Sequence, residues 1–179
     1  NNNLGIVRLN YNEILQVDTS FEAKILTPGT VYGLSPQQDG KLMVCGDFSV
    51  VGGEFTQKLI RLNANGNLDK TFTPDITKEI IPYGVKTLPN GLLVVAATYI
   101  STGDFSKING LAILTKEGKL IRNVAFPYFG NGQGAIVYLD VSQDKIYAGE
   151  STAYNVNGRG GQNLVIYDHF GEQPVNLND

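Results

Sequence analysis

The chain is poor in the residues that build metal sites and nucleophile sites. Its 179 residues include one cysteine, one histidine, one methionine and no tryptophan. A single cysteine, Cys45, excludes an intrachain disulfide bond. His169 is the only other residue of the His/Cys type, so the usual zinc site cannot be assembled. We therefore expect no cofactor and no metal, and we expect Cys45 to be a buried core residue in the apolar run KLMVCGDF.

Charge is also scarce. Charged residues make up 17% of the chain, and the formal net charge is −3. A mildly acidic protein lacks the basic surface that nucleic acid or an anionic membrane attracts. No apolar run reaches the roughly 18 residues that a membrane-spanning helix needs. We expect no nucleic-acid partner and no transmembrane segment.

Glycine and aromatic residues are plentiful by contrast. The chain has 21 Gly, 9 Tyr and 8 Phe. Its apolar runs are four to eight residues long and end at Gly, Asn, Asp or Pro. Short apolar runs that end at turn-forming residues favour β-strands over helices.

One segment of the sequence recurs four times. RLNYNEILQVDTSF (8–21) returns as RLNANGNLDKTF (61–72), and the first six residues of the latter, RLNANG, return as ILTKEG (113–118) and IYDHFG (166–171). The step is about 52 residues, which is long enough for a complete supersecondary unit. We divide the chain into a first repeat (1–26), a second (27–76), a third (77–129) and a fourth (130–179).

A second element recurs with the first. VYGLSPQQDGKLMVCGDF (31–48) matches PYGVKTLPNGLLVVAATY (82–99), so that Tyr32 aligns with Tyr83 and Gly33 with Gly84. A looser copy in the fourth repeat places Cys45, Ala96 and Gly149 in one column. Small residues in one column indicate a close approach between neighbouring sheets.

Each full repeat reads as four short antiparallel strands, which we name a, b, c and d. In the second repeat they cover about 31–34, 41–48, 58–63 and 67–72. Asp39-Gly40 and Asn65-Gly66 supply the tight turns between a and b and between c and d, and Asn90-Gly91 and Glu117-Gly118 do so in the third repeat. Four antiparallel strands at this period are typical of β-propeller blades.

The second repeat resembles a known family. The stretch DGKLMVCGDFSVVGGEFTQKLIRLNANGNLDKTFTPDI (39–76) is similar to the delta-sixty repeat, a β-propeller repeat of unknown function. The residues that carry the resemblance are Asp39-Gly40-Lys41, Gly46, Phe48, Gly52-Gly53, Arg61-Leu62-Asn63, Asn65-Gly66, Leu68-Asp69 and Phe72. The first repeat keeps the pattern in part, whereas Ile113 and Ile166 replace the arginine in the third and fourth. The resemblance implies a secreted or surface-attached bacterial protein, and it brings no catalytic residue.

The predicted fold is an all-β, incomplete β-propeller of about three and a half blades. The first repeat holds only strands c and d, so it is half a blade, and three full blades follow it. An incomplete arc leaves open strand edges, which invite pairing. We expect the chain to be part of a larger propeller, with these edges paired to missing segments or to another copy.

The connections between strands b and c and between d and a are long, and we name their side of the molecule the long-loop face. Binding residues on repeat scaffolds concentrate in such loops. The expected ligand-binding residues are Tyr128, Phe129, Tyr154, Arg159, Asp104 and Phe105. An alternative is that Phe55, Phe105 and Phe129 fill gaps between blades.

The expected function is that of a non-enzymatic binding or scaffold module of a secreted or cell-surface bacterial protein. It would take a glycan or a protein on the long-loop face, while the short-turn face stays inert. The alternative is a carbohydrate-active hydrolase or lyase, but no spacing singles out a pair among its candidate acids. Those acids are Glu54, Asp75, Glu79 and Asp104. A virion tail or adhesion component is a further alternative.

Overall fold

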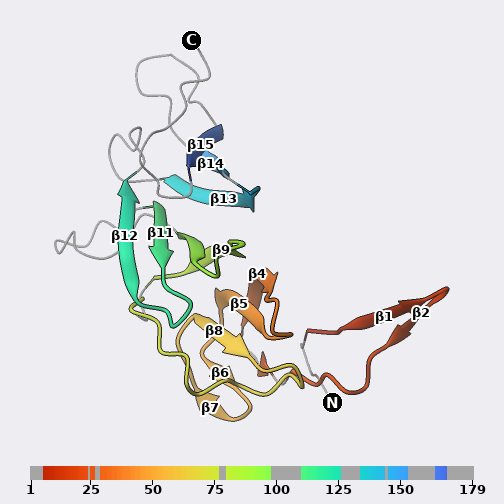
Figure 1. The fold of residues 1–179 in the computed structure, drawn as a ribbon. Coiled ribbons are helices and arrows are strands. Elements are labelled where there is room, and N and C mark those ends of the chain that lie inside the picture. The colour runs from red at the N-terminus through yellow and green to blue at the C-terminus, as the bar shows by residue number, and fades with distance from the viewer. Residues whose placement is uncertain are drawn as a thin grey trace.

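The chain forms a row of small antiparallel sheets (Figure 1). The computed structural model describes residues 6–23, 25–26, 29–76, 80–97, 110–125, 134–143, 145–152 and 164–168. All regular elements in these residues are strands. They contain no helix long and apolar enough to cross a membrane. The all-β prediction is confirmed, and the described residues do not close into a complete propeller.

The third repeat has the four strands that its sequence predicts. β9 (Pro82–Thr87), β10 (Leu93–Ala97), β11 (Gly110–Leu114) and β12 (Leu120–Ala125) pair in the order β12-β11-β10-β9. β12 pairs with β11 over its whole length, from Gly110 opposite Ala125 to Leu114 opposite Leu120. The outer edge of β11 is therefore covered by a full strand.

The second repeat has three strands instead of four. β4 (Thr30–Pro36), β5 (Leu42–Asp47) and β8 (Leu59–Leu62) form one sheet in that order. The prediction of a strand at 67–72 is wrong, because residues 67–72 form only a single bridge, between Leu68 and Leu62. The chain leaves the sheet immediately after that bridge.

The fourth repeat contributes three described strands. β13 (Gly134–Val141), β14 (Lys145–Thr152) and β15 (Leu164–Asp168) pair in that order. The expected fourth strand falls in residues 169–179, outside the described residues.

The turn glycines adopt the backbone conformation that the sequence predicts. Gly40, Gly66, Gly91 and Gly118 all have positive φ, between 79° and 92°. Gly66 and Gly118 are needed for a second reason, because each turn packs against the preceding repeat. A Cβ on Gly66 would lie 2.5 Å from the carbonyl carbon of Glu22, and a Cβ on Gly118 would lie 2.8 Å from the Cα of Pro74. These two glycines allow successive repeats to touch.

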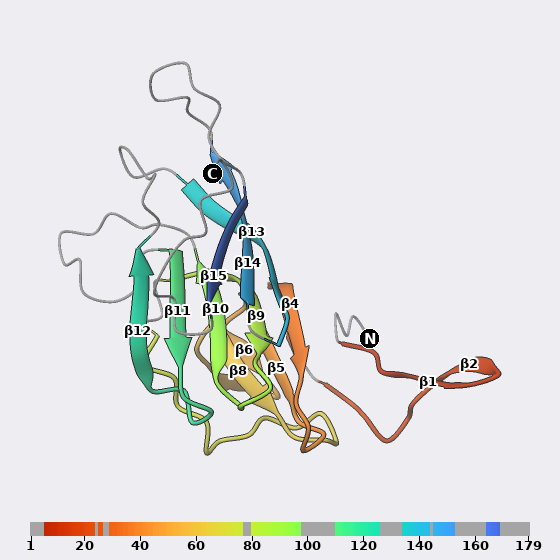
Figure 2. The ribbon, with the colours of Figure 1, turned by 45° about the horizontal axis from the view of Figure 1, so that its top comes forward.

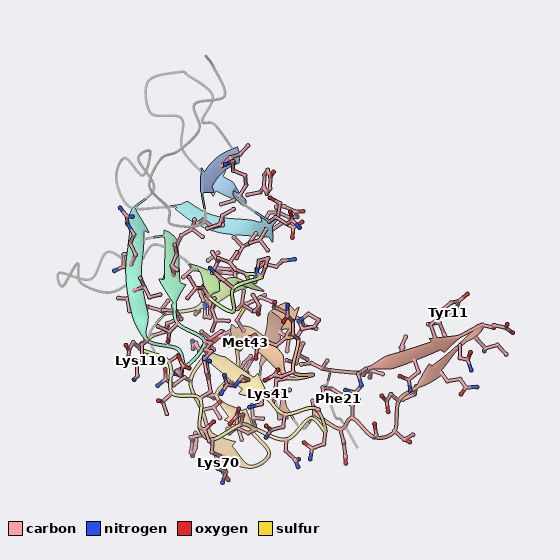
Figure 3. The ribbon with its side chains drawn as sticks, viewed as in Figure 1. Tyr11, Phe21, Lys41, Met43, Lys70 and Lys119 are labelled. Carbon is pink, nitrogen blue, oxygen red and sulfur yellow. The ribbon has the colours of Figure 1, made fainter. Side chains whose placement is uncertain are left out.

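The hydrophobic core is divided into three clusters, and each lies between two successive repeats. Alternating residues of a strand point to opposite faces of a sheet. Accordingly, Met43 and Cys45 of β5 pack toward the third repeat, while Val44 packs toward the first. In β10, Val95 joins the same cluster as Met43, while Val94 packs toward the fourth repeat. Figure 1 shows the sheets stacked in sequence order, Figure 2 shows strands β9 to β12 side by side, and Figure 3 shows Met43 between the sheets.

Cys45 lies at the close approach between the second and third repeats, as predicted. It is fully buried, and burial raises the pKa of its thiol to about 12. A Cβ on Gly33 would lie 2.8 Å from the Cys45 Sγ and 3.2 Å from the Cα of Gly84. The aligned glycines therefore let the inner strands of two repeats touch.

The first repeat carries an exposed ribbon. β1 (Leu9–Asn12) and β2 (Ile14–Val17) form a two-stranded hairpin that projects away from the other sheets, with Tyr11 near its far end (Figures 1 and 3). Its pair Leu9–Val17 corresponds to the bridge Leu62–Leu68 of the second repeat. The ribbon is thus a lengthened c–d turn.

The b–c connection of the second repeat, expected to be a loop, contains a small sheet. β6 (Val50–Val51) and β7 (Glu54–Phe55) form a hairpin around Gly52-Gly53, and β3 (Ile25–Leu26) pairs with β6. Both glycines have positive φ, which a two-residue hairpin turn requires. This hairpin holds Phe55 at a fixed place on the long-loop face.

Candidate functional site

The chain turns away from β8 at Asp69. The backbone N–H and the hydroxyl of Thr71 donate to Asp69 Oδ1 at 3.0 and 2.6 Å. The N–H of Phe72 donates to the carbonyl oxygen of Asp69 at 3.2 Å. Aspartate side chains that bond the backbone two residues on form such turns in competition with strands. This turn explains why the predicted fourth strand does not form.

The other carboxylate oxygen of Asp69 holds two cations. Arg61 Nε donates to Asp69 Oδ2 at 2.8 Å, and Lys41 Nζ donates to it at 2.9 Å. Burial raises the pKa of Asp69, which is only 5% exposed, but the hydrogen bonds from Thr71, Lys41 and Arg61 outweigh burial and hold the pKa well below its usual range. Asp69 is therefore a buried, ionised anchor.

Arg61 extends this arrangement to the third repeat. Its guanidinium lies over the Phe72 ring, 5.0 Å from the centroid, and its Nη1 donates to the carbonyl oxygen of Lys116 at 2.8 Å. Lys116 lies in the c–d turn of the next repeat. We name the set Arg61, Asp69, Thr71 and Phe72 the Arg61 clasp.

The first repeat contains an equivalent clasp made of Arg8, Asp18, Ser20 and Phe21. Arg8 Nε donates to Asp18 Oδ2 at 2.7 Å, and the Ser20 hydroxyl donates to Asp18 Oδ1 at 2.6 Å. Arg8 Nη1 donates to the carbonyl oxygen of Ala64 at 3.0 Å, in the c–d turn of the second repeat. The hydrogen bonds from Ser20 and Arg8 lower the pKa of Asp18 to about 2. The Arg-Leu-Asn motif, together with Leu-Asp-x-Thr-Phe in the second repeat and Val-Asp-x-Ser-Phe in the first, thus encodes a contact between repeats.

The Asp69 turn leaves a groove beside β8. Its volume is about 370 Å³. It lies between the end of the b–c connection and the segment that diverges after Leu68. The residues that line it are Glu54, Phe55, Thr56, Gln57, Leu59, Ile60, Leu68, Asp69, Lys70, Phe72, Thr73 and Pro74. We name it the β8 groove.

The rim of the β8 groove carries one protruding aromatic side chain and one ion pair. Phe55 is 86% exposed, so it does not fill a gap between sheets, and that alternative is wrong for this residue. Lys70 Nζ donates to Glu54 Oε1 at 2.6 Å across the groove, and Figure 3 shows Lys70 beside the β6–β7 hairpin. The hydroxyl of Thr56 is buried without a hydrogen-bond partner among the described residues.

Gln57 fixes the far wall of the groove. In the amide orientation that satisfies both of its ends, its side-chain nitrogen donates to the carbonyl oxygens of Pro74, at 3.2 Å, and Ile76. These bonds tie the diverging segment to the residue that stands two positions before β8. The groove is therefore maintained by side chains on both walls.

The six residues expected to bind ligand all lie outside the described residues. These are Tyr128, Phe129, Tyr154, Arg159, Asp104 and Phe105, and their roles stay predictions. Sequence reasoning missed Thr56, Gln57 and Lys70 as groove residues. The signal that could have found them is the Leu-Asp-x-Thr-Phe motif, which marks where the chain leaves the sheet.

Two of the four candidate catalytic acids can be placed. Glu54 is paired with Lys70, and Asp75 accepts hydrogen bonds from Lys119 Nζ and the N–H of Leu120, both at 3.1 Å. Asp75 thus connects the second repeat to the third. Glu79 and Asp104 lie outside the described residues. In the part of the chain that the structure describes, no cluster of His, Cys, Asp and Glu could hold a metal ion.

The described residues thus form an all-β chain of repeated antiparallel sheets that touch through their turns. Residues 37–72 match a family described as a domain of unknown function (DUF5122) beta-propeller. The resemblance of the second repeat to a propeller repeat of unknown function is thereby confirmed. A search of curated proteins finds no match.

Proposed function

We propose that the chain is a non-enzymatic, protein-binding module. In this proposal an extended segment of a partner protein adds to the edge of β8 at Leu59, because residues 67–69 already pair with the rest of that edge, and it packs against Phe55. The observation that supports it most is the β8 groove, because it gives access to a strand edge that β12 covers in the third repeat.

The direction of the backbone groups supports this mode of binding. The N–H of Gly46 donates to the carbonyl oxygen of Lys58, so Lys58 directs its carbonyl toward β5. Backbone groups of successive strand residues alternate in direction. Leu59 therefore directs its N–H and C=O to the groove side. In the third repeat the aligned residue is Leu111, and Val124 of β12 pairs with it from the corresponding side. A peptide strand would take that place.

The rim supplies what a peptide side chain needs. An exposed aromatic anchor beside polar groups is the usual composition of a binding hot spot. Phe55 offers apolar area without any hydrogen-bonding atom, which suits an apolar peptide side chain better than a sugar. Lys70 and Glu54 can exchange their mutual ion pair for backbone or charged groups of the peptide.

The wider context forms part of the same proposal. The four repeats would be successive blades of a larger propeller in a secreted or surface-attached bacterial protein, in which the long-loop face meets the partner. The family match of residues 37–72 and the contacts between repeats support the propeller arrangement. Digestion of the protein by an added protease on intact cells would test the location.

The test is selection of linear peptides from a random display library on the purified chain. We expect enriched peptides to bind the parent chain and to lose at least about tenfold in affinity with Phe55→Ala, as hot-spot anchors do. Ile121→Ala is the matched control, because Ile121 is an exposed apolar residue on the covered edge of the third repeat. Failure to enrich any peptide, or equal binding by both variants, would contradict the proposal.

A further inference from the structure

A second hollow lies where the inner strands of three repeats meet. β9 lies between β4 and β13, and strands β4, β9 and β13 are the first strands of successive sheets (Figure 1). Residues of all three line a hollow of about 230 Å³. This hollow shares no lining residue with the β8 groove.

Each inner strand breaks its pairing at a corresponding place. The register with the second strand skips Tyr32 in β4, Tyr83 in β9 and Val137 in β13. Such bulges redirect side chains and are frequent at functional sites. In β4 and β9 the bulged residue is the aligned tyrosine, and in β13 Tyr138 directly follows the bulge; all three tyrosines line the hollow. Three tyrosines from three repeats therefore face one hollow.

The tyrosine rings form an accessible surface. The Tyr32 and Tyr83 rings are in contact, with centroids 4.9 Å apart and planes tilted by 35°. Tyr32 is 43% exposed and Tyr138 is 59% exposed. None of the three phenol oxygens has a hydrogen-bond partner among the described residues. The hollow thus presents ring faces together with free phenol donors and acceptors.

The wall of the hollow is electrically balanced. Gly33 and Gly84 line it, and the space that a side chain would take is filled by Cys45 at Gly33 and by Leu139 at Gly84. Lys86 is the one cation that lines it, and its Nζ lies 3.0 Å from Asp140 Oδ1 of the fourth repeat. Because this ion pair is already formed, the site offers no net charge to attract an anion or a cation.

These features select one class of ligand. Ring faces pack against apolar C–H surface, and free phenols exchange hydrogen bonds with hydroxyl groups. A neutral sugar offers both on one small ring. A proline-rich peptide would need a slot between aromatic rings, but the contact between Tyr32 and Tyr83 closes that slot. We propose that Tyr32, Tyr83 and Tyr138 form a binding site for a neutral oligosaccharide across the inner strands.

The site does not depend on the protein-binding groove, and the experiment separates the two. The probes are neutral hexasaccharides of β-1,4-glucose, α-1,4-glucose, xylose, mannose and N-acetylglucosamine, with binding followed by saturation-transfer NMR. We expect at least one to bind with millimolar affinity or better. Tyr138→Ala and Tyr32→Ala should each weaken that affinity at least fivefold, because each removes a ring from the site.

Two controls keep the result interpretable. Tyr138→Phe keeps the ring and loses only the hydroxyl, so it should weaken binding less than Tyr138→Ala does. Phe55→Ala should leave sugar binding unchanged, and the thermal unfolding midpoint of every variant should match that of the parent chain.

Four outcomes would overturn the proposal. They are no binding of any hexasaccharide at about 10 mM, binding that survives both alanine variants, stronger binding of a charged oligosaccharide such as polygalacturonate, and binding of a proline-rich peptide alone.

Discussion

The second and third repeats differ at two aligned positions, and that difference changes the edge of the sheet. The second repeat has Arg61 and Asp69, which form the clasp and turn the chain away from β8. The third repeat has Ile113 and Ile121 at these positions, and β12 continues as a strand along β11. In the second repeat, Arg61 and Asp69 thus form a contact with the next repeat where the third repeat has the strand β12. The β8 groove is left open as a result.

The junctions that follow the two repeats both have an apolar core, but they differ at the aligned position of Arg61 and Ile113. Arg61 reaches the turn of the third repeat through a hydrogen bond to Lys116. Ile113 is instead buried in a cluster with Ile136 and Leu139 of the fourth repeat. Apolar packing joins two repeats without diverting the chain, so the strand edge stays covered. A polar contact at this aligned position and an accessible edge therefore occur together in this molecule.

The largest expected effect comes from placing the clasp arginine in the third repeat. Ile113→Arg buries a cation without a carboxylate partner, and we expect a loss of about 4 kcal/mol in the free energy of unfolding. Ile113→Arg combined with Ile121→Asp should recover part of that loss, because the aligned aspartate restores the pair. Urea unfolding followed by circular dichroism measures both. If the free energy of unfolding of Ile113→Arg alone lies within about 1 kcal/mol of that of the parent chain, the junction between the third and fourth repeats is not tightly packed.

Removing the carboxylate of the Arg61 clasp should have a smaller effect. Asp69→Asn weakens the bonds to Arg61 and Lys41 and should cost about 2 kcal/mol at pH 7, in the range for hydrogen bonds to charged groups. The same change at Asp18 should cost less, because among the described residues Asp18 has hydrogen bonds from Arg8 and Ser20 and none from a lysine.

The effect of Asp69→Asn should also depend on pH. The pKa of Asp69 is lower in the folded protein than its ordinary value of 3.8. The stabilisation is therefore complete above about pH 4 and is lost as the pH falls through the folded-state pKa. The difference between the parent chain and Asp69→Asn should shrink in urea titrations below pH 4. A constant difference at all pH values would mean that the charge of Asp69 does not stabilise the fold.

The smallest expected effect concerns the c–d turns of the first and second repeats. Both turns contain a residue with positive φ. In the second repeat this residue is a glycine, Gly66, but at the tip of the ribbon it is Glu13, with a φ of 64°. A side chain in this conformation is strained, so Glu13→Gly should stabilise the protein by about 0.5 kcal/mol. Glu13→Ala keeps the strain and serves as the control. Thermal unfolding that shows the two variants to be equal would exclude strain at this turn.

The sequence predicted the features that depend on local chemistry. The turn glycines and the small residues in the Cys45 column were identified because their requirements lie within one turn or one aligned column. The fourth strand of the second repeat was predicted wrongly because Leu68 and Phe72 have the apolar spacing of a strand. The side chain of Asp69 bonds the backbone of Thr71, and this local bond outweighs the apolar pattern.

The sites depend on relations between distant segments, which the sequence does not show. The β8 groove exists because a neighbouring strand is missing, and Phe55 is exposed because the β6–β7 hairpin holds it outward. Tyr32 and Tyr83 were aligned from the sequence, but the alignment did not show that their rings touch. That contact requires the inner strands of two repeats to lie side by side.

The division of the core into three clusters has a consequence for how the molecule loses its structure. Each cluster joins only two successive repeats, so the folding free energy behaves as a sum of nearest-neighbour couplings along a line. The second and third repeats each have two coupled neighbours, and amide protons in β5 and β10 should be the slowest to exchange with solvent. Fraying then starts at the ends of the row and moves inward. Duplication of one repeat would lengthen the row without disturbing the cores already formed.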